Sequence, residues 1–244
     1  PSPFNVKTKV YGYGGKGYIA TEHGLFFINN GDGRLYKISN SGIRPITKKR
    51  KSIYFADLHW DAKHHRIIAV QESCREGKEA SHKIVAINVC SGAVQLLHEG
   101  QDFYSSPRVS PCGQKLAFVY WNHPNMPWDE TKLMILTLSK TGSPLEENKL
   151  GIDNESIGQP EWSQNHLFFI SDRNGYWNLY KFDGQEIQCC FTDENDYADP
   201  SWVLGTSSYA IIDCDLLALA RTSPTGGLVL VNHKEQNAEE IKLS

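Results

Sequence analysis

Features that would indicate a membrane, nucleic-acid or helical protein are missing from this sequence. None of the 244 residues belongs to an apolar run of about 18 residues, the length a membrane-spanning helix needs. The 25 Lys and Arg nearly balance the 28 Asp and Glu, so no basic excess favours nucleic acid. No segment shows a helical apolar stripe with caps. We therefore expect a soluble all-β protein with neither a membrane nor a nucleic-acid partner.

Paired metal or disulfide motifs are also missing. None of the six cysteines forms a C-x-x-C pair, and the nine histidines are scattered. We therefore expect no metal site and no cofactor. We interpret the cysteines as free thiols in a reducing compartment, the cytoplasm, in preference to a disulfide framework. They are Cys74, Cys90, Cys112, Cys189, Cys190 and Cys214.

The sequence also lacks a catalytic serine motif. No G-x-S-x-G nucleophile elbow occurs, and the nearest segment, 205–209, lacks the second glycine. A serine without a positioned base and oxyanion donors is not an efficient nucleophile. We therefore expect this chain by itself not to be an enzyme. Its first residue is proline rather than methionine, and we interpret it as an excised segment of a longer protein.

A repeat runs through the whole chain. Five short apolar segments align on Leu35, Ile84, Leu133, Leu179 and Leu228, at intervals of 46 or 49 residues. A period of about 40–50 residues built from short β segments is typical of propeller blades. Glycine, asparagine and aspartate turns separate about four strands in each repeat, which predicts small antiparallel sheets.

The repeat divides the chain into five expected blades. We place their boundaries at residues 10–50, 52–100, 103–152, 155–195 and 197–244. Blade one is predicted to open with a strand at 11–20. Blade five is predicted to have strands at 199–203, 208–213, 228–232 and 239–244.

Two motifs give the repeat a family resemblance. The string SDRNGYWNLY (171–180) resembles the signature of TolB-type propeller repeats. The stretch 103–133 resembles the propeller of the prolyl oligopeptidase family, in the branch of acylaminoacyl-peptidase-like and dipeptidyl-peptidase-like enzymes. Within it, HPNMPWDET (123–131) is the most specific part, and the segments 3–20 and 155–163 fit the same family.

The resemblance implies a function that depends on a second domain. In that family a propeller of about seven or eight blades caps an α/β-hydrolase domain with a Ser-Asp-His triad. This chain departs from the pattern because only five blades and no hydrolase domain are found, and because Cys112 replaces the usual turn aspartate. The resemblance implies a fragment that acts as the lid of a serine peptidase, with the hydrolase domain and peptides as its partners. The alternative is a stand-alone TolB-like or WD-type interaction propeller without catalytic activity.

One loop is the main candidate site. It contains two prolines that stiffen it and two large apolar side chains, which usually bury against something. Two interpretations remain open: contact with the hydrolase domain or its active-site mouth, and packing onto the adjacent blade. The residues are His123, Pro124, Asn125, Met126, Pro127, Trp128 and Asp129.

Charged residues mark two further regions. Arg108 and Glu161 each follow a proline in successive blades, and we place Asp57 at the same register. We expect all three to line the central channel and to form charge pairs across it. The basic run 48–51, KKRK, lies between blades one and two and resembles a polyanion-binding or nuclear-localisation run; the alternative is a solvated loop.

An incomplete ring leaves two sheets without a neighbour. A propeller hides its strand edges by closing on itself, so five blades of a larger ring would form a crescent or a strained closure. We expect dimerisation or aggregation through the exposed ends.

Overall fold

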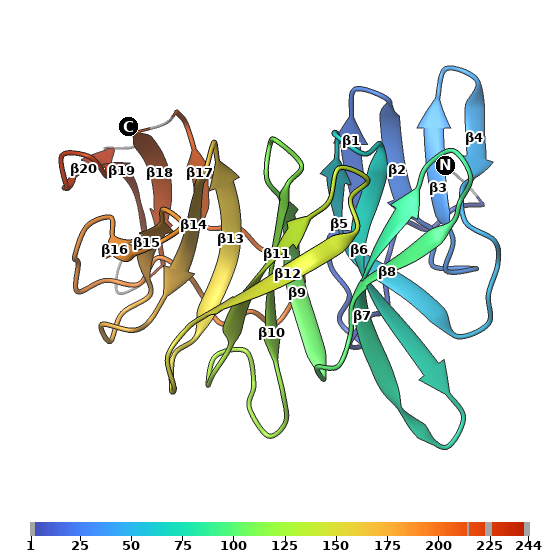
Figure 1. The fold of residues 1–244 in the computed structure, drawn as a ribbon, viewed down its shortest axis with the longest axis horizontal. Helices are drawn as coiled ribbons and strands as arrows, with labels where there is room; N and C mark the ends of the chain where they lie inside the picture. Colours follow the sequence, from blue (N-terminus) through green and yellow to red (C-terminus); the bar gives the residue numbers. More distant parts are fainter. Residues whose placement is uncertain (1–2, 214, 223–225, 242–244) are drawn as a thin grey trace.

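The computed structural model describes residues 3–213, 215–222 and 226–241, and these residues form five four-stranded antiparallel sheets (Figure 1). The predicted all-β propeller fold is confirmed. Cys214 and the predicted strand end at 242–244 lie outside the described residues. No helix of the described residues is long and apolar enough to cross a membrane.

Each sheet contains four strands that are consecutive in the chain and paired in that order. The first three sheets are β1 (Tyr18–Thr21), β2 (Gly24–Ile28), β3 (Leu35–Ser39) and β4 (Gly42–Pro45); β5 (Ile53–Asp61), β6 (Arg66–Arg75), β7 (Lys78–Asn88) and β8 (Val94–His98); and β9 (Phe103–Val109), β10 (Lys115–Trp121), β11 (Lys132–Leu138) and β12 (Pro144–Leu150). The last two are β13 (Ile157–Ser163), β14 (His166–Ser171), β15 (Asn178–Phe182) and β16 (Ile187–Cys189); and β17 (Tyr209–Ile211), β18 (Leu216–Arg221), β19 (Gly227–Asn232) and β20 (Asn237–Ile241). We call these sheets blades one to five.

The repeated apolar segments are the third strands of the five blades, β3, β7, β11, β15 and β19. Each second strand contains a short apolar run; in β10 every residue after Lys115 is buried. Both observations have one cause, because neighbouring blades pack face to face, so that the middle strands of blades two, three and four are covered on both sides. The cores therefore lie between the blades.

Two predicted strands of the end blades are wrong. Residues 11–17 are not a strand, because Tyr11, Gly12, Gly14 and Gly15 have positive φ and turn the chain repeatedly. Residues 199–203 are not a strand either. Blade five instead opens at β17, and its second strand is 216–221, which the prediction missed.

The outer strand of blade three was also missed. β12 is exposed along nearly its whole length and contains the run Glu146-Glu147-Asn148-Lys149. A solvated edge strand needs no apolar alternation, so its sequence gives no strand signal.

The first strands of blades two, three and four share a left-handed residue at a bulge: Asp57, Ser106 and Gln159, with φ of 53° to 54°. All three residues take part in hydrogen bonds that connect one blade to the next. The Ser106 N–H donates to Asp57 Oδ2 over 2.6 Å, and the Ser208 N–H donates to Gln159 Oε1 over 2.6 Å. The bulges therefore join adjacent blades near the centre.

The five blades form an open arc. Blade one and blade five lie at opposite ends of the longest axis of the molecule (Figure 1). On the inside of the arc, the segment before β1 contacts the segment before β17, where Leu204 N–H donates to Gly14 O over 3.1 Å. This approach requires glycine at position 15, since a Cβ there would lie 2.0 Å from the carbonyl oxygen of Leu204.

Candidate functional site

The predicted loop connects β10 to β11 and is anchored on blade four. Thr131 Oγ1 donates to Ile157 O over 2.7 Å and accepts the Ile157 N–H over 2.6 Å. Ser156 Oγ donates to Pro127 O over 2.6 Å. All these groups are buried, so the loop is fixed at its base.

The S-D-R motif of the repeat signature holds the anchor in place. Glu155 is fully buried, and its Oε1 accepts hydrogen bonds from Ser171 Oγ over 2.5 Å and Arg173 Nε over 2.8 Å. Asp172 Oδ1 accepts the Ser156 N–H over 2.8 Å. The signature of blade four therefore positions Glu155 and Ser156, which both hydrogen-bond to the loop of blade three: Glu155 O accepts the Thr131 N–H, and Ser156 Oγ donates to Pro127 O.

Above this anchor, the loop forms one wall of an apolar hollow of about 370 Å³, which we call the aromatic hollow. Its other walls come from the segment before β1, from blades two and three, and from the connection between blades four and five. Six aromatic rings line it: Tyr11, Tyr13, Phe103, Trp121, Trp128 and Trp202.

The structure brings three of the seven predicted loop residues to the hollow. Met126, Pro127 and Trp128 line it, and the Trp128 ring lies 4.4 Å from the Trp202 ring, centroid to centroid. Met126 stays 43% exposed and Trp202 stays 55% exposed. The hollow is thus open and lined by large apolar groups.

The other four loop residues do not line the hollow. Asp129 Oδ2 accepts the Met126 N–H over 2.8 Å and so shapes the turn. The His123 ring packs edge-on against Phe103, with centroids 4.9 Å apart. The Asn125 N–H donates to Asn122 O, and Pro124 is exposed.

A carboxylate lies at the floor of the hollow. Glu72 Oε2 accepts the Tyr11 N–H over 2.9 Å and lies 3.2 Å from His82 Nε2. Burial by itself raises the pKa of Glu72, but the hydrogen bonds from His82 and from the Tyr11 N–H outweigh burial and lower it. Glu72 therefore stays ionised and ties the β6–β7 hairpin to the N-terminal segment.

The sequence did not point to most of the hollow. Tyr11 and Tyr13 were placed in a predicted strand, and Trp202 in another. Glu72 and His82 lie ten residues apart on two strands of one hairpin and carry no motif. Only the unusual number of aromatic residues in these short segments was a usable signal.

The second predicted group meets on the inner side of the arc. Arg108 Nε lies 3.1 Å from Glu161 Oε2, and Arg108 Nη1 lies 3.6 Å from Asp57 Oδ1. Arg108 and Asp57 are buried, whereas the Glu161 side chain is 46% exposed. Arg108 therefore connects two carboxylates from neighbouring blades.

The register assigned to Asp57 was wrong. Arg108 pairs with Ala117 and Glu161 with Phe168, and the matching residue of blade two is His59, which pairs with Ile68. The bulge shifts the first strand, so Asp57 matches Ser106 and Gln159 instead. Alternation along a regular strand does not predict such a shift.

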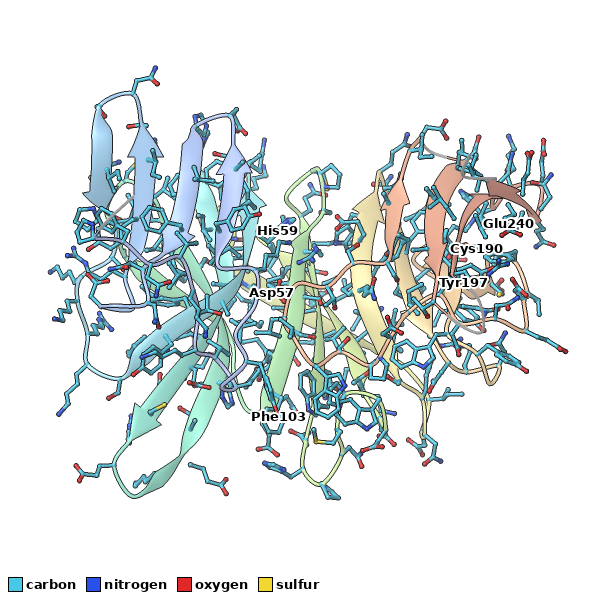
Figure 2. The ribbon with its side chains drawn as sticks, turned by 180° about the vertical axis from the view of Figure 1, so that it is seen from behind. Asp57, His59, Phe103, Cys190, Tyr197 and Glu240 are labelled. Carbon is cyan, nitrogen blue, oxygen red and sulfur yellow. The ribbon has the colours of Figure 1, made fainter. Side chains whose placement is uncertain are left out.

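His59 places a neutral imidazole beside these charges. Asp57 and His59 lie near the middle of the molecule (Figure 2). Burial, with the charges of Arg108 and Lys16, lowers the pKa of His59 well below its usual value. Burial and Arg108 also lower the pKa of Lys16. Among the described residues, no group of three or more His, Cys, Asp or Glu is arranged to hold a metal ion.

The chain resembles solved structures of peptidases along its whole length. No protein-family model and no curated protein sequence matches the chain. A puromycin-hydrolysing peptidase from Mycobacterium tuberculosis matches it with 28% identity and a TM-score of 0.90, over 100% of this chain. The predicted resemblance to the propeller of prolyl oligopeptidase family peptidases is confirmed.

Other solved structures share the same fold. A puromycin hydrolase matches over 99% of the chain, with 24% identity and a TM-score of 0.90. An oligogalacturonate lyase from Vibrio parahaemolyticus matches over 92% of this chain and 64% of its own, with 12% identity and a TM-score of 0.65. This chain spans only 41% of the M. tuberculosis peptidase and 40% of the puromycin hydrolase.

Proposed function

We propose that this chain is the propeller of a serine peptidase of the prolyl oligopeptidase family and acts as its lid. The observation that carries the proposal is the match to the M. tuberculosis puromycin-hydrolysing peptidase along the whole chain, at a TM-score of 0.90. In this function the propeller covers the catalytic cleft and admits only short or unfolded peptides. The α/β-hydrolase domain of the same protein supplies the nucleophile, the base and the oxyanion donors.

The aromatic hollow is the surface that we assign to contact with the hydrolase domain or with the mouth of its active site. Met126 and Trp202 expose apolar side chains there, and a contiguous apolar patch on a rigid base is typical of an interaction site. The hydrogen bonds of Thr131 and Ser156 keep the loop in one conformation, so little conformational entropy is lost on contact.

The remaining partners and the location follow from the same proposal. The substrates are short peptides, and the end blades associate with further β structure or with a second copy. The five described cysteines are free thiols, which supports the cytoplasm as the location.

The native protein provides the test. Antibodies against this chain are used to purify the protein from its own cells, and its mass and its labelling by a fluorophosphonate probe are measured. We expect a polypeptide much larger than 27.5 kDa that the probe labels. We also expect hydrolysis of short peptides to be faster than that of the same cleavage sequence embedded in a folded protein.

A native protein of about 27.5 kDa that the probe does not label and that purifies with stable protein partners would instead support the stand-alone interaction propeller. If the probe labels the protein but peptides and folded proteins are hydrolysed at equal rates, the protein is a peptidase and the lid function of the propeller is contradicted.

The role of the hollow is tested in the same full-length protein. Trp128→Ala is compared with Leu145→Ala, which removes an exposed apolar side chain from β12, away from the hollow. Burying one large apolar side chain stabilises a contact by about 1.5–3 kcal/mol, and 1.4 kcal/mol is about a tenfold effect. We expect Trp128→Ala to lower kcat/KM for short peptides about tenfold and Leu145→Ala to leave it unchanged. Equal effects of both variants would contradict the assignment.

A further inference from the structure

A polar cleft of about 220 Å³ opens between blades one and two and shares no lining residue with the aromatic hollow. The connection between β4 and β5 forms one wall, and the turn between β7 and β8 forms the other. The two walls lie close together at Gly92. Only glycine fits at this position, because a Cβ there would lie 2.1 Å from Ile46 O. Apolar Ile53, Phe55 and Val94 close the cleft on the side of the sheet.

Two of the four residues of the basic run line this cleft. Lys48 and Arg50 face it, whereas Lys49 and Lys51 do not. This alternation is the one that an extended chain imposes, since successive side chains point to opposite sides. The run therefore divides into a pair of cations at the cleft and a pair in solvent.

The cleft cations have no acidic partner in the part of the chain that the structure describes. All twelve ion pairs found there involve other cations, and none includes Lys48 or Arg50. The protein as a whole carries a net charge of −3, so this concentration of positive charge does not follow from composition. Two like charges beside one concave surface repel each other, and a bound anion removes that repulsion.

We propose that this cleft is a binding site for a small phosphate-bearing anion. The planar guanidinium of Arg50 can donate two parallel hydrogen bonds to phosphate oxygens, and the Lys48 ammonium supplies a point charge. Neutral groups complete the site: Thr47, Gln71 and Ser91 lie along the same cleft. The size of the cleft suits a phosphate or a diphosphate group rather than a polymer.

The test uses pyrophosphate as the probe and titration calorimetry as the measurement. Lys48→Gln combined with Arg50→Gln removes the two cleft charges. Lys49→Gln combined with Lys51→Gln is the matched control, since it removes the same charge from the same run but away from the cleft. Both cleft cations would make charge-assisted hydrogen bonds or ion pairs with the anion, so we expect the cleft variant to bind at least about tenfold more weakly and the control to bind like the wild type.

Two results overturn the proposal: no binding of pyrophosphate by the wild-type chain, or equal weakening in both double variants, which would show non-specific attraction to the basic run. All four substituted side chains are exposed, so both variants are expected to fold. A thermal unfolding scan of each variant checks this directly.

Discussion

Two exposed thiols differ in the groups that surround them. Burial and the neighbouring carboxylate of Glu72 raise the pKa of Cys74. Partial burial also acts to raise the pKa of Cys112, but the hydroxyl of Ser110, backbone N–H groups and Lys115 outweigh it and lower that pKa. Cys112 therefore carries the larger thiolate fraction at neutral pH.

We expect iodoacetamide to modify Cys112 faster than Cys74 at neutral pH, because the thiolate is the reacting species. The measurement is peptide mapping by mass spectrometry over a time course. Ser110→Ala is the control, since it removes a hydrogen bond that stabilises the thiolate and is expected to slow Cys112 alone. Equal rates at Cys74 and Cys112 in the wild-type protein would contradict the assignment.

The ionised carboxylate of Glu72 makes the stability of the folded protein depend on pH. Its pKa is lowered in the folded protein, so its contribution to stability is complete above the unfolded value of about 4.3 and is lost as pH falls through the folded value. We expect Glu72→Gln to lower the free energy of unfolding by about 2 kcal/mol at neutral pH. At a pH below both values the two proteins should be equally stable.

Urea unfolding of both proteins at the two pH values measures this difference. A variant that is equally destabilised at both would show that packing, and not charge, explains the effect of Glu72.

At the scale of elements, the loop between β10 and β11 depends on one hydroxyl. Thr131 is 1% exposed and uses its Oγ1 as both donor and acceptor towards Ile157. Thr131→Val keeps the shape but leaves the N–H and the C=O of Ile157 without this partner. We expect a loss of about 2–3 kcal/mol in the free energy of unfolding.

Thr131→Ser is the matched control, because it retains the hydroxyl and removes only a methyl group, and it should lose about 1 kcal/mol. Urea unfolding measures both variants. If Thr131→Val were no less stable than Thr131→Ser, the hydroxyl would not be the anchor of the loop.

At the scale of the whole molecule, the open arc exposes the outer face of blade five. Leu217, Leu219, Val229 and Val231 pack in the core shared with blade four. The alternate residues, among them Leu230, point to the opposite face, where they remain half-buried. An uncovered apolar sheet face next to a strand edge favours association.

We therefore expect the chain, expressed by itself, to self-associate, with a sedimentation coefficient that rises with concentration. Leu230→Glu should shift the population towards monomer, whereas Leu145→Glu on exposed β12 should not. A wild-type chain that stays monomeric at every concentration would contradict this expectation.

Much of the fold follows from the sequence by itself. The middle strands of blades two, three and four are covered on both faces, so burial requires short apolar runs such as 115–121 and 166–171, and these repeat visibly. The turns between strands require glycine or small polar residues, which mark the repeat a second time. Burial of a strand and the geometry of a turn each restrict residues that are close in the chain. Both can therefore be predicted from the sequence without knowing which blades are neighbours.

Tertiary structure alone decided the end blades and the sites. Residues 11–17 and 199–204 contain aromatic residues that suit a strand, yet they contact each other across the inside of the arc instead. The aromatic hollow collects side chains from positions 11 to 204, and the register of Asp57 depends on a bulge that hydrogen-bonds to the next blade. A local pattern records which face of a strand is buried, but contacts between distant segments depend on the packing of whole blades, and no local pattern contains that information.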